Sequence, residues 1–272
     1  MIRMIKSGLY KLFKDKTFKV TLIIGAALAV FMNLLYVAIG ALADDVAGFC
    51  NGQTFFISSL SPTQNFGLTV PINLVIFTVA EFNHGTIRNK IIAGNKRSEI
   101  YLSLFLIGLI FTISLMTIYF GVSVGIASLI GGFDVNGTSG MIEGLNSFMP
   151  EYLYQYSLMA LATYIFIVSL AIFFSVNFQN IGGTISLTII IIMFLYFAAF
   201  VPSVAEITDI VMGQFEPSPM MYFNPLYTFG AFSLVYPTIS SEWFAWSLIT
   251  PLYWTVILIF LGIVTFNKKD LK

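Results

Sequence analysis

Long stretches without a charged residue constrain this chain more than any other feature. No Asp, Glu, Lys or Arg occurs from Val20 to Ala43 or from Tyr152 to Ala205. A helix rises about 1.5 Å per residue and must cross roughly 30 Å of hydrocarbon, so about 20 apolar residues make one membrane span. Hydrophobic residues fill 58% of the 272 positions and charged residues only 10%, whereas soluble domains contain about 45–50% apolar residues. We therefore expect an integral membrane protein.

The charge-free stretches predict an all-α fold in one transmembrane domain over 1–272. Turn-forming residues between Asn177 and Gly183 divide the longest stretch into two spans. The predicted spans are six: about 18–43, 57–82, 99–130, 153–176, 184–205 and 243–266. A further apolar stretch, 217–241, contains four prolines that disfavour a continuous helix. We expect interrupted outer helices there, packed against the fifth and sixth spans.

Basic residues are confined to three segments of the chain. All thirteen Lys and Arg lie before the first span, between the second and third spans, or after the sixth, and the other loops contain only acids. Because cytoplasmic loops collect Lys and Arg, this pattern predicts a multi-pass protein of the cell (plasma) membrane with both termini in the cytoplasm.

The first sixteen residues combine basic residues with a helical apolar pattern. Apolar residues recur at steps of three and four: Ile2, Ile5, Leu9, Leu12 and Phe13. This spacing predicts a helix over 1–16 that lies on the cytoplasmic membrane surface. An ordinary basic flank of the first span is the alternative.

The sequence offers no group of residues suited to catalysis. One cysteine, Cys50, and one histidine, His84, exclude a zinc site built from paired Cys or His ligands. No phosphate-binding loop of the form G-x-x-x-x-G-K-[ST] and no HExxH occurs, and the formal net charge of zero gives no basic excess for nucleic acid. We expect no catalytic residue, no metal and no cofactor in this chain. No charged residue lies in the middle of a predicted span, where ion-coupled transporters usually carry one.

The loop 81–99 is the most structured polar segment. Thr86 is placed to cap a short helix on which Ile87 and Ile91 share a face, and Gly94 with Asn95 forms a left-handed terminator. Such a helix is suited to docking into a groove of a cytosolic partner. The alternative is that its basic residues only set the topology and contact lipid phosphates.

Residues of this loop resemble a known family. Glu81, Gly85-Thr86, Gly94, Arg97 and Tyr101 follow the pattern E-x3-G-T-x7-G-x2-R-x3-Y, which resembles that of type-2 (ABCG-like) ABC exporter permeases, in the bacterial branch that exports bacteriocins, peptides or drugs. The resemblance implies a second permease copy, as a homodimer or with a sister chain, and a separate cytosolic P-loop ATPase that binds ATP and Mg. The coupling residues it implies are Glu81, Gly85, Thr86, Ile87, Arg88, Ile91, Gly94 and Arg97.

In that family the substrate moves between spans two and five of the two protomers. The polar candidates on those spans are Asn65, Thr69, Asn73, Thr184 and Thr188, although polar residues in membrane helices also serve as contacts between helices. The resemblance predicts export of an amphipathic, peptide-like or hydrophobic substrate by alternating access. An ion-coupled or passive secondary transporter and a non-transporting membrane sensor or assembly protein are the alternatives.

Overall fold

The computed structural model describes residues 2–61, 69–133, 150–178, 180–211, 222–227 and 241–269. Over these residues the chain is helical and contains no strand. The elements in chain order are α1 (Ile2–Lys14), α2 (Lys16–Leu42), α3 (Val46–Phe49), α4 (Gly52–Leu60), α5 (Thr69–Asn83), α6 (Thr86–Ile92), α7 (Arg97–Gly131), α8 (Pro150–Asn177), α9 (Ile181–Val211) and α10 (Ser241–Lys268). The expected all-α membrane class is confirmed.

Five helices of the described residues are long and apolar enough to cross a membrane: α2, α7, α8, α9 and α10. They begin and end near the first, third, fourth, fifth and sixth predicted spans. The shortest of them, α2, has 27 residues and reaches about 40 Å at 1.5 Å per residue, which exceeds the roughly 30 Å hydrocarbon core.

The second predicted span, 57–82, is not one continuous helix. Helix α4 ends at Leu60, Ser61 is not helical, and α5 begins at Thr69. A proline at position 62 explains the break, because the residue before a proline is disfavoured in the helical conformation. With 15 residues, α5 reaches about 22 Å and is shorter than the hydrocarbon core.

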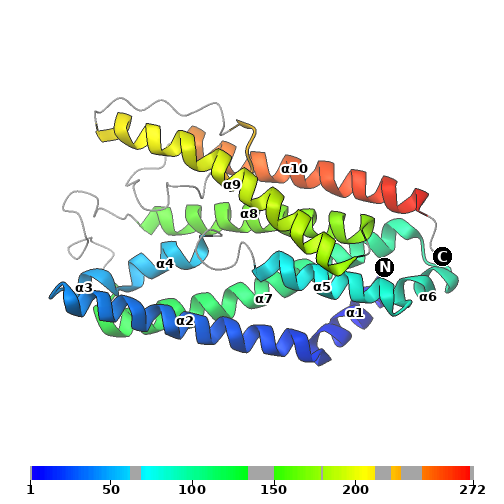
Figure 1. Ribbon diagram of the computed structural model, residues 1–272, viewed down its shortest axis with the longest axis horizontal. Helices are drawn as coiled ribbons and strands as arrows, with labels where there is room; N and C mark the ends of the chain where they lie inside the picture. The colour runs from blue at the N-terminus through cyan, green and yellow to red at the C-terminus, as the bar shows by residue number, and fades with distance from the viewer. Residues whose placement is uncertain are drawn as a thin grey trace.

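Helices α7 and α8 form the centre of the bundle (Figure 1). Helix α7 contacts α1, α2, α4 and α10, and α8 contacts α5, α9 and α10. In the most apolar 18 residues of α8, 78% of the residues are buried, whereas 17% are buried in the corresponding stretch of α2. Gly108 allows close packing here, because a Cβ at this position would lie 3.0 Å from Ile172 and 3.2 Å from Val168. The outer helices α2, α9 and α10 therefore present most of their apolar surface outward.

The amphipathic N-terminal helix is present as α1, but it packs against the bundle. Met4 and Leu12 are buried, and Gly8 lies against Ile107 of α7. Of the apolar positions expected to share a face, Leu12 turns inward whereas Phe13 is 51% exposed. Asp15 then caps α2, because its carboxylate accepts a hydrogen bond of 2.9 Å from the Thr17 amide.

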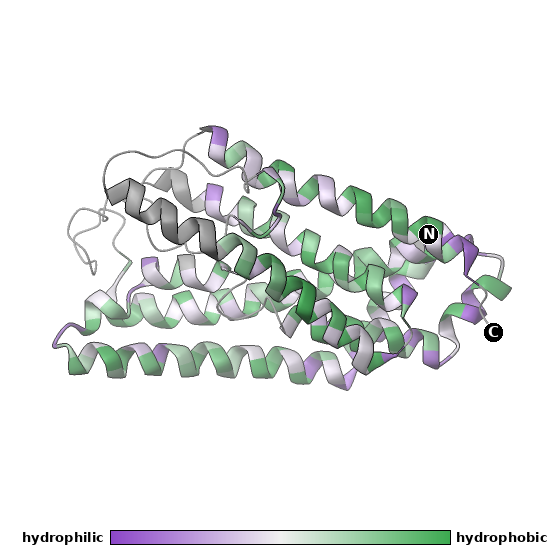
Figure 2. Ribbon diagram, turned by 45° about the horizontal axis from the view of Figure 1, so that its top comes forward, coloured by the Kyte–Doolittle hydropathy of each residue, from purple (hydrophilic) through white to green (hydrophobic). Residues whose placement is uncertain are grey.

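The basic segments gather at one end of the molecule. Both chain termini and α6 lie at the right of Figure 1, whereas α3 lies at the opposite end. Figure 2 shows hydrophilic residues at this end and mainly apolar residues along the long helices. This arrangement brings the three basic segments of the sequence together, as the charge distribution predicts.

The short segment 222–227 packs beside α9 and α10, as expected for the proline-containing stretch. Asn224 donates a hydrogen bond of 2.8 Å to the Leu195 carbonyl of α9. From α10, Tyr253 and Trp254 donate hydrogen bonds to the carbonyls of Tyr222 and Phe223. These partners lie near the middle of both helices, so the segment reaches into the bundle rather than covering only its end. The rest of 217–241 lies outside the described residues.

Candidate functional site at the basic end

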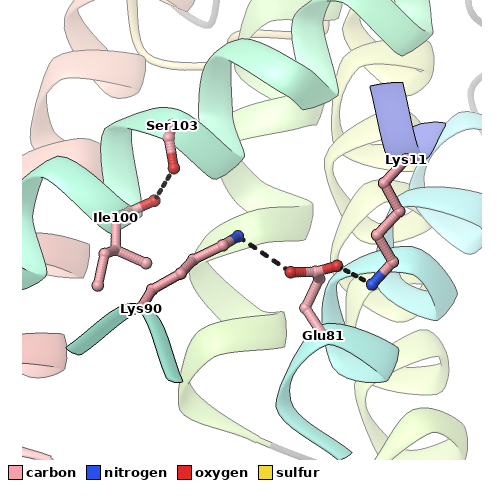
Figure 3. A network of polar contacts seen from close by, with 5 residues as sticks. All are labelled: Lys11, Glu81, Lys90, Ile100 and Ser103. Atoms are coloured by element: carbon pink, nitrogen blue, oxygen red, sulfur yellow. Dashed lines mark hydrogen bonds and ion pairs between the residues drawn. The ribbon is translucent and has the colours of Figure 1, made fainter. Parts of the chain in front are cut away.

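Glu81 lies at the centre of the basic end (Figure 3). Its side chain sits in the last turn of α5 and the residue is only 2% exposed. The carboxylate accepts hydrogen bonds from Lys11 of α1 and from Lys90 of α6, the latter at 3.0 Å. A buried carboxylate is stable as an ion only with such partners. One side chain thus ties the helices α1, α5 and α6 together.

Helix α6 begins and ends at glycines in the left-handed conformation. Gly85 is the N-cap residue with φ 67°, and Gly94 has φ 83°. At the C-terminus, Gly94 donates to the Ile91 carbonyl and Asn95 to the Lys90 carbonyl, which is the hydrogen-bond pattern of a Schellman motif. The predicted terminator is therefore confirmed.

The predicted role of Thr86 as the cap of this helix is wrong. Thr86 is the first helical residue, the cap is Gly85, and no side chain caps the N-terminus. The chain must turn sharply after α5, and a glycine adopts the required positive φ without steric cost. The turn geometry therefore places the cap one residue earlier than the side-chain chemistry indicates.

The apolar face of α6 points into its own chain. Ile87 is buried and Ile91 packs against the hydrophobic core. The outward face consists of Arg88, Asn89 and Ile92, the last 74% exposed. The bundle therefore covers Ile87 and part of Ile91, so a partner would meet the other face of α6. Docking of α6 into a partner stays a prediction.

Arg97 closes the C-terminus of another helix. Its Nη1 donates hydrogen bonds of 3.1, 3.0 and 2.6 Å to the carbonyls of Phe266, Asn267 and Lys269 at the end of α10. The last carbonyls of a helix lack the usual donors four residues further on, and a cation there also interacts favourably with the helix dipole. The guanidinium is thus occupied within the chain.

Lys269 provides the equivalent contact for α8. Its ammonium donates hydrogen bonds of 2.6 and 2.9 Å to the carbonyls of Val176 and Asn177 and lies 5.8 Å from the Phe82 ring centroid. Burial lowers the pKa of this lysine. Arg97 and Lys269 together connect the ends of α7, α10 and α8.

The candidate substrate-path residues have hydrogen-bond partners inside the chain. Asn73 accepts a hydrogen bond of 2.9 Å from Thr21 of α2 and donates one of 2.8 Å to the Thr69 carbonyl. Thr184 and Thr188 are fully buried. Thr184 donates to the carbonyls of Phe178 and Asn180 just before α9, and Thr188 donates to the Thr184 carbonyl. Asn73 is thus a contact between helices, Asn65 lies outside the described residues, and a substrate path along this set stays a prediction.

The sequence did not predict two interactions at the basic end, the ion pairs Lys11–Glu81 and Lys90–Glu81. Lys11 belongs to the amphipathic helix and Lys90 to the basic loop, so their shared partner Glu81 could not be read from spacing. The available signal was Glu81 itself, an acid at the end of an apolar segment among basic segments. Such a side chain requires a counter-charge when it is buried.

No group of three His, Cys, Asp or Glu side chains suited to a metal ion is found in the described ranges. No known family model matches the chain, and no curated protein sequence matches it. The functional assignment therefore rests on the residues at the basic end.

Proposed function

We propose that this chain is the membrane-spanning permease subunit of an ATP-driven exporter. A separate cytosolic P-loop ATPase binds ATP and Mg and docks on α6, and two permease chains form the transport unit. The substrate is an amphipathic, peptide-like or hydrophobic molecule that leaves the cell by alternating access. The membrane is the plasma membrane, with the basic end in the cytoplasm.

The observation that carries this proposal is the construction of α6. It is a seven-residue helix held between α5 and α7 at the basic end, fixed on its inner face by Ile87 and by the Lys90–Glu81 ion pair. Its outer face carries Arg88, Asn89 and the exposed Ile92. A short helix that is anchored on one side and exposes an apolar residue beside two polar ones is suited to transmit the movement of a docked partner.

Glu81 connects α6 to the helices of the membrane bundle, so a movement of α6 can reach them. Because Lys90 of α6 and Lys11 of α1 share its carboxylate, a displacement of α6 acts on α5 and α1 through one ion-pair network.

The decisive experiment is to purify the chain from its native membrane in mild detergent and to identify bound proteins by mass spectrometry. We expect a stoichiometric P-loop ATPase and vanadate-sensitive ATP hydrolysis by the complex. The substitutions Arg88→Glu and Ile92→Glu are expected to reduce ATPase recovery about tenfold or more, because they change the outer face at the centre of the contact.

The matched control is Lys268→Glu, an equal charge reversal of an exposed residue at the same end. It should leave ATPase recovery unchanged. A chain that is recovered alone and without ATP hydrolysis, or an ATPase that binds all three variants equally, would contradict the proposal.

A further inference from the structure

A cavity of about 200 Å³ lies where α1, α2, α5 and α7 meet. Each of these helices contributes an apolar side chain to its lining: Leu12, Phe18, Phe77 and Phe111. Phe77 is half-buried and the other three are buried. A cavity of about 150 Å³ engineered in another protein holds benzene, whereas sites for drug-sized molecules measure roughly 300–1,000 Å³. The cavity therefore has room for one aromatic ring with a short side chain.

Four polar residues complete the lining: Asp15, Thr17, Asn73 and His84. The Asn73 amide already accepts a hydrogen bond from Thr21 and donates one to a backbone carbonyl. Thr17 and His84 are exposed, and neither side chain has a hydrogen-bond partner in the described part of the chain. The cavity thus offers polar groups that a ligand can use beside an aromatic interior.

Asp15 is the one acid among the lining residues that the structure describes. Its Oδ1 atom accepts a hydrogen bond of 2.9 Å from the Thr17 amide and so caps α2. Asp15 is half-buried and forms no ion pair with any described residue, so its second carboxylate oxygen can still accept. A carboxylate and the faces of aromatic rings both attract a cation. The lining therefore favours a ligand that joins a positive group to an apolar body.

Two lysines of α1 lie close in sequence to Asp15 but have other partners. Lys11 is paired with Glu81, and Lys14 lies 4.5 Å from the Tyr10 ring centroid. Neither of them lines the cavity. Asp15 is thus left without a cation from α1.

The lysines at the start of α2 point away from the cavity. With 3.6 residues per turn, Lys16 and Lys19 lie on the opposite side of α2 from the face that carries Thr17 and Phe18. Both lysines are exposed, and salt screens exposed charges over about 8–10 Å. A ligand inside the cavity, in contrast, meets the Asp15 carboxylate directly.

We propose that this cavity binds an organic ammonium ion, a protonated amine on a compact aromatic body. The ammonium group donates hydrogen bonds to the free oxygen of Asp15 and to the Thr17 hydroxyl. The ring packs among Phe18, Phe77 and Phe111. This site goes beyond the proposed function, and the inference does not depend on an ATPase.

The test compares three probes that share a ring and differ in charge. They are 4-fluorophenethylamine, which is a cation at neutral pH, the neutral 2-(4-fluorophenyl)ethanol and the anionic 3-(4-fluorophenyl)propanoate. Binding to the full-length chain in a neutral detergent is measured by fluorine NMR titration, and empty micelles correct for partitioning. We expect the amine to bind about tenfold more tightly than the alcohol. The propanoate should give no more signal than it does with empty micelles.

Asp15→Asn removes the charge and keeps the cap of α2, because Asn and Asp are equally good N-cap residues. This variant is expected to bind the amine about tenfold more weakly and the alcohol as before. Asp44→Asn is the matched control, since Asp44 is an exposed acid just beyond the other end of α2, and it should change neither affinity.

A second variant tests the cavity itself. Ala80 of α5 is half-buried in the lining, and Ala80→Leu places three more carbon atoms there. It is expected to weaken binding of the amine and of the alcohol alike, whereas Ala27→Leu, on the exposed face of α2, should not.

Equal affinities for the amine and the alcohol would overturn the proposal, and so would an Asp15→Asn variant that binds the amine as tightly as the unmodified chain. Tighter binding of the propanoate than of the amine would overturn it too, because the lysines of this end would then dominate. If Ala80→Leu fails to fold, the Asp15→Asn variant still decides, because it changes neither the shape of the side chain nor the cap.

Discussion

Glu81 shows how one side chain can hold several elements together. Its carboxylate is buried, and two lysines from different helices neutralise it. Each ion pair alone is weak evidence for stability, because desolvation offsets the Coulomb attraction. Removing the shared carboxylate is different, because it leaves Lys90 with most of its side chain buried and without a counter-charge.

We therefore expect Glu81→Gln to lower the free energy of unfolding by about 3 kcal/mol. Thermal unfolding in detergent measures this change, and Glu242→Gln, at an exposed acid of α10, is the control. Adding Lys90→Met should recover part of the loss, because the second substitution removes the unpaired charge. Strictly additive losses in the double variant would show that the Lys90–Glu81 pair is not coupled.

Tyr101 has a hydroxyl group that is buried without a hydrogen-bond partner in the described part of the chain. It faces Gly262 of α10 so closely that a Cβ at 262 would overlap the phenol ring. We expect Tyr101→Phe to be neutral or stabilising, since it removes an unsatisfied polar group.

The opposite change at the same contact should be costly. Gly262→Ala is expected to destabilise the protein by about 1–3 kcal/mol through overpacking, and Tyr101→Phe should relieve part of that loss. The same unfolding assay measures both variants. If Tyr101→Phe is markedly destabilising, the hydroxyl has a partner that this packing does not explain.

At the scale of elements, helix ends are closed by residues that are distant in sequence. Arg97 at the start of α7 caps α10, and Lys269 after α10 caps α8. These contacts make the three helix ends one unit, so a change at any of them acts on the others.

Arg97→Gln is accordingly expected to loosen the end of α10. Hydrogen bonds from a charged donor contribute about 1.5–3 kcal/mol when buried, and Arg97 is half-buried, so we expect about 1–2 kcal/mol. Amide hydrogen exchange should become faster over residues 263–268 and remain unchanged in α2. Arg88→Gln, on the exposed face of α6, is the control and should leave α10 unaffected.

At the scale of the whole molecule, the three basic segments define one end of the bundle. This predicts that residue 89 on α6 faces the cytoplasm and residue 43 at the end of α2 faces outside. In a Cys50→Ser background, Asn89→Cys should react with a membrane-impermeant maleimide only after the cells are opened. Ala43→Cys should react in intact cells, and the reverse pattern would invert the topology.

Native Cys50 is expected to react slowly in the same assay. It is fully buried, and burial raises the pKa of the thiol, so little reactive thiolate is present at neutral pH. Fast labelling of Cys50 in the unmodified chain would show that the contact of α3 and α4 with α7 opens.

The sequence by itself determined the fold class, the five long helices, the gathering of the basic residues at one end and the Gly94 terminator of α6. These follow from local properties: transfer free energy over about 20 residues, helical periodicity and the conformational freedom of glycine. The interruption of the helix at Ser61 also has a local cause, because a proline follows at position 62.

Only the tertiary structure decided that Ile87 and Ile91 face inward, that Lys11 and Lys90 share Glu81, and that Arg97 caps α10. Each of these contacts joins elements whose approach depends on how the whole bundle packs. Spacing along the chain specifies which residues share a helix face, but not what that face meets. For the same reason, the cavity that Leu12, Phe18, Phe77 and Phe111 line could not be predicted, because segments distant in sequence enclose it.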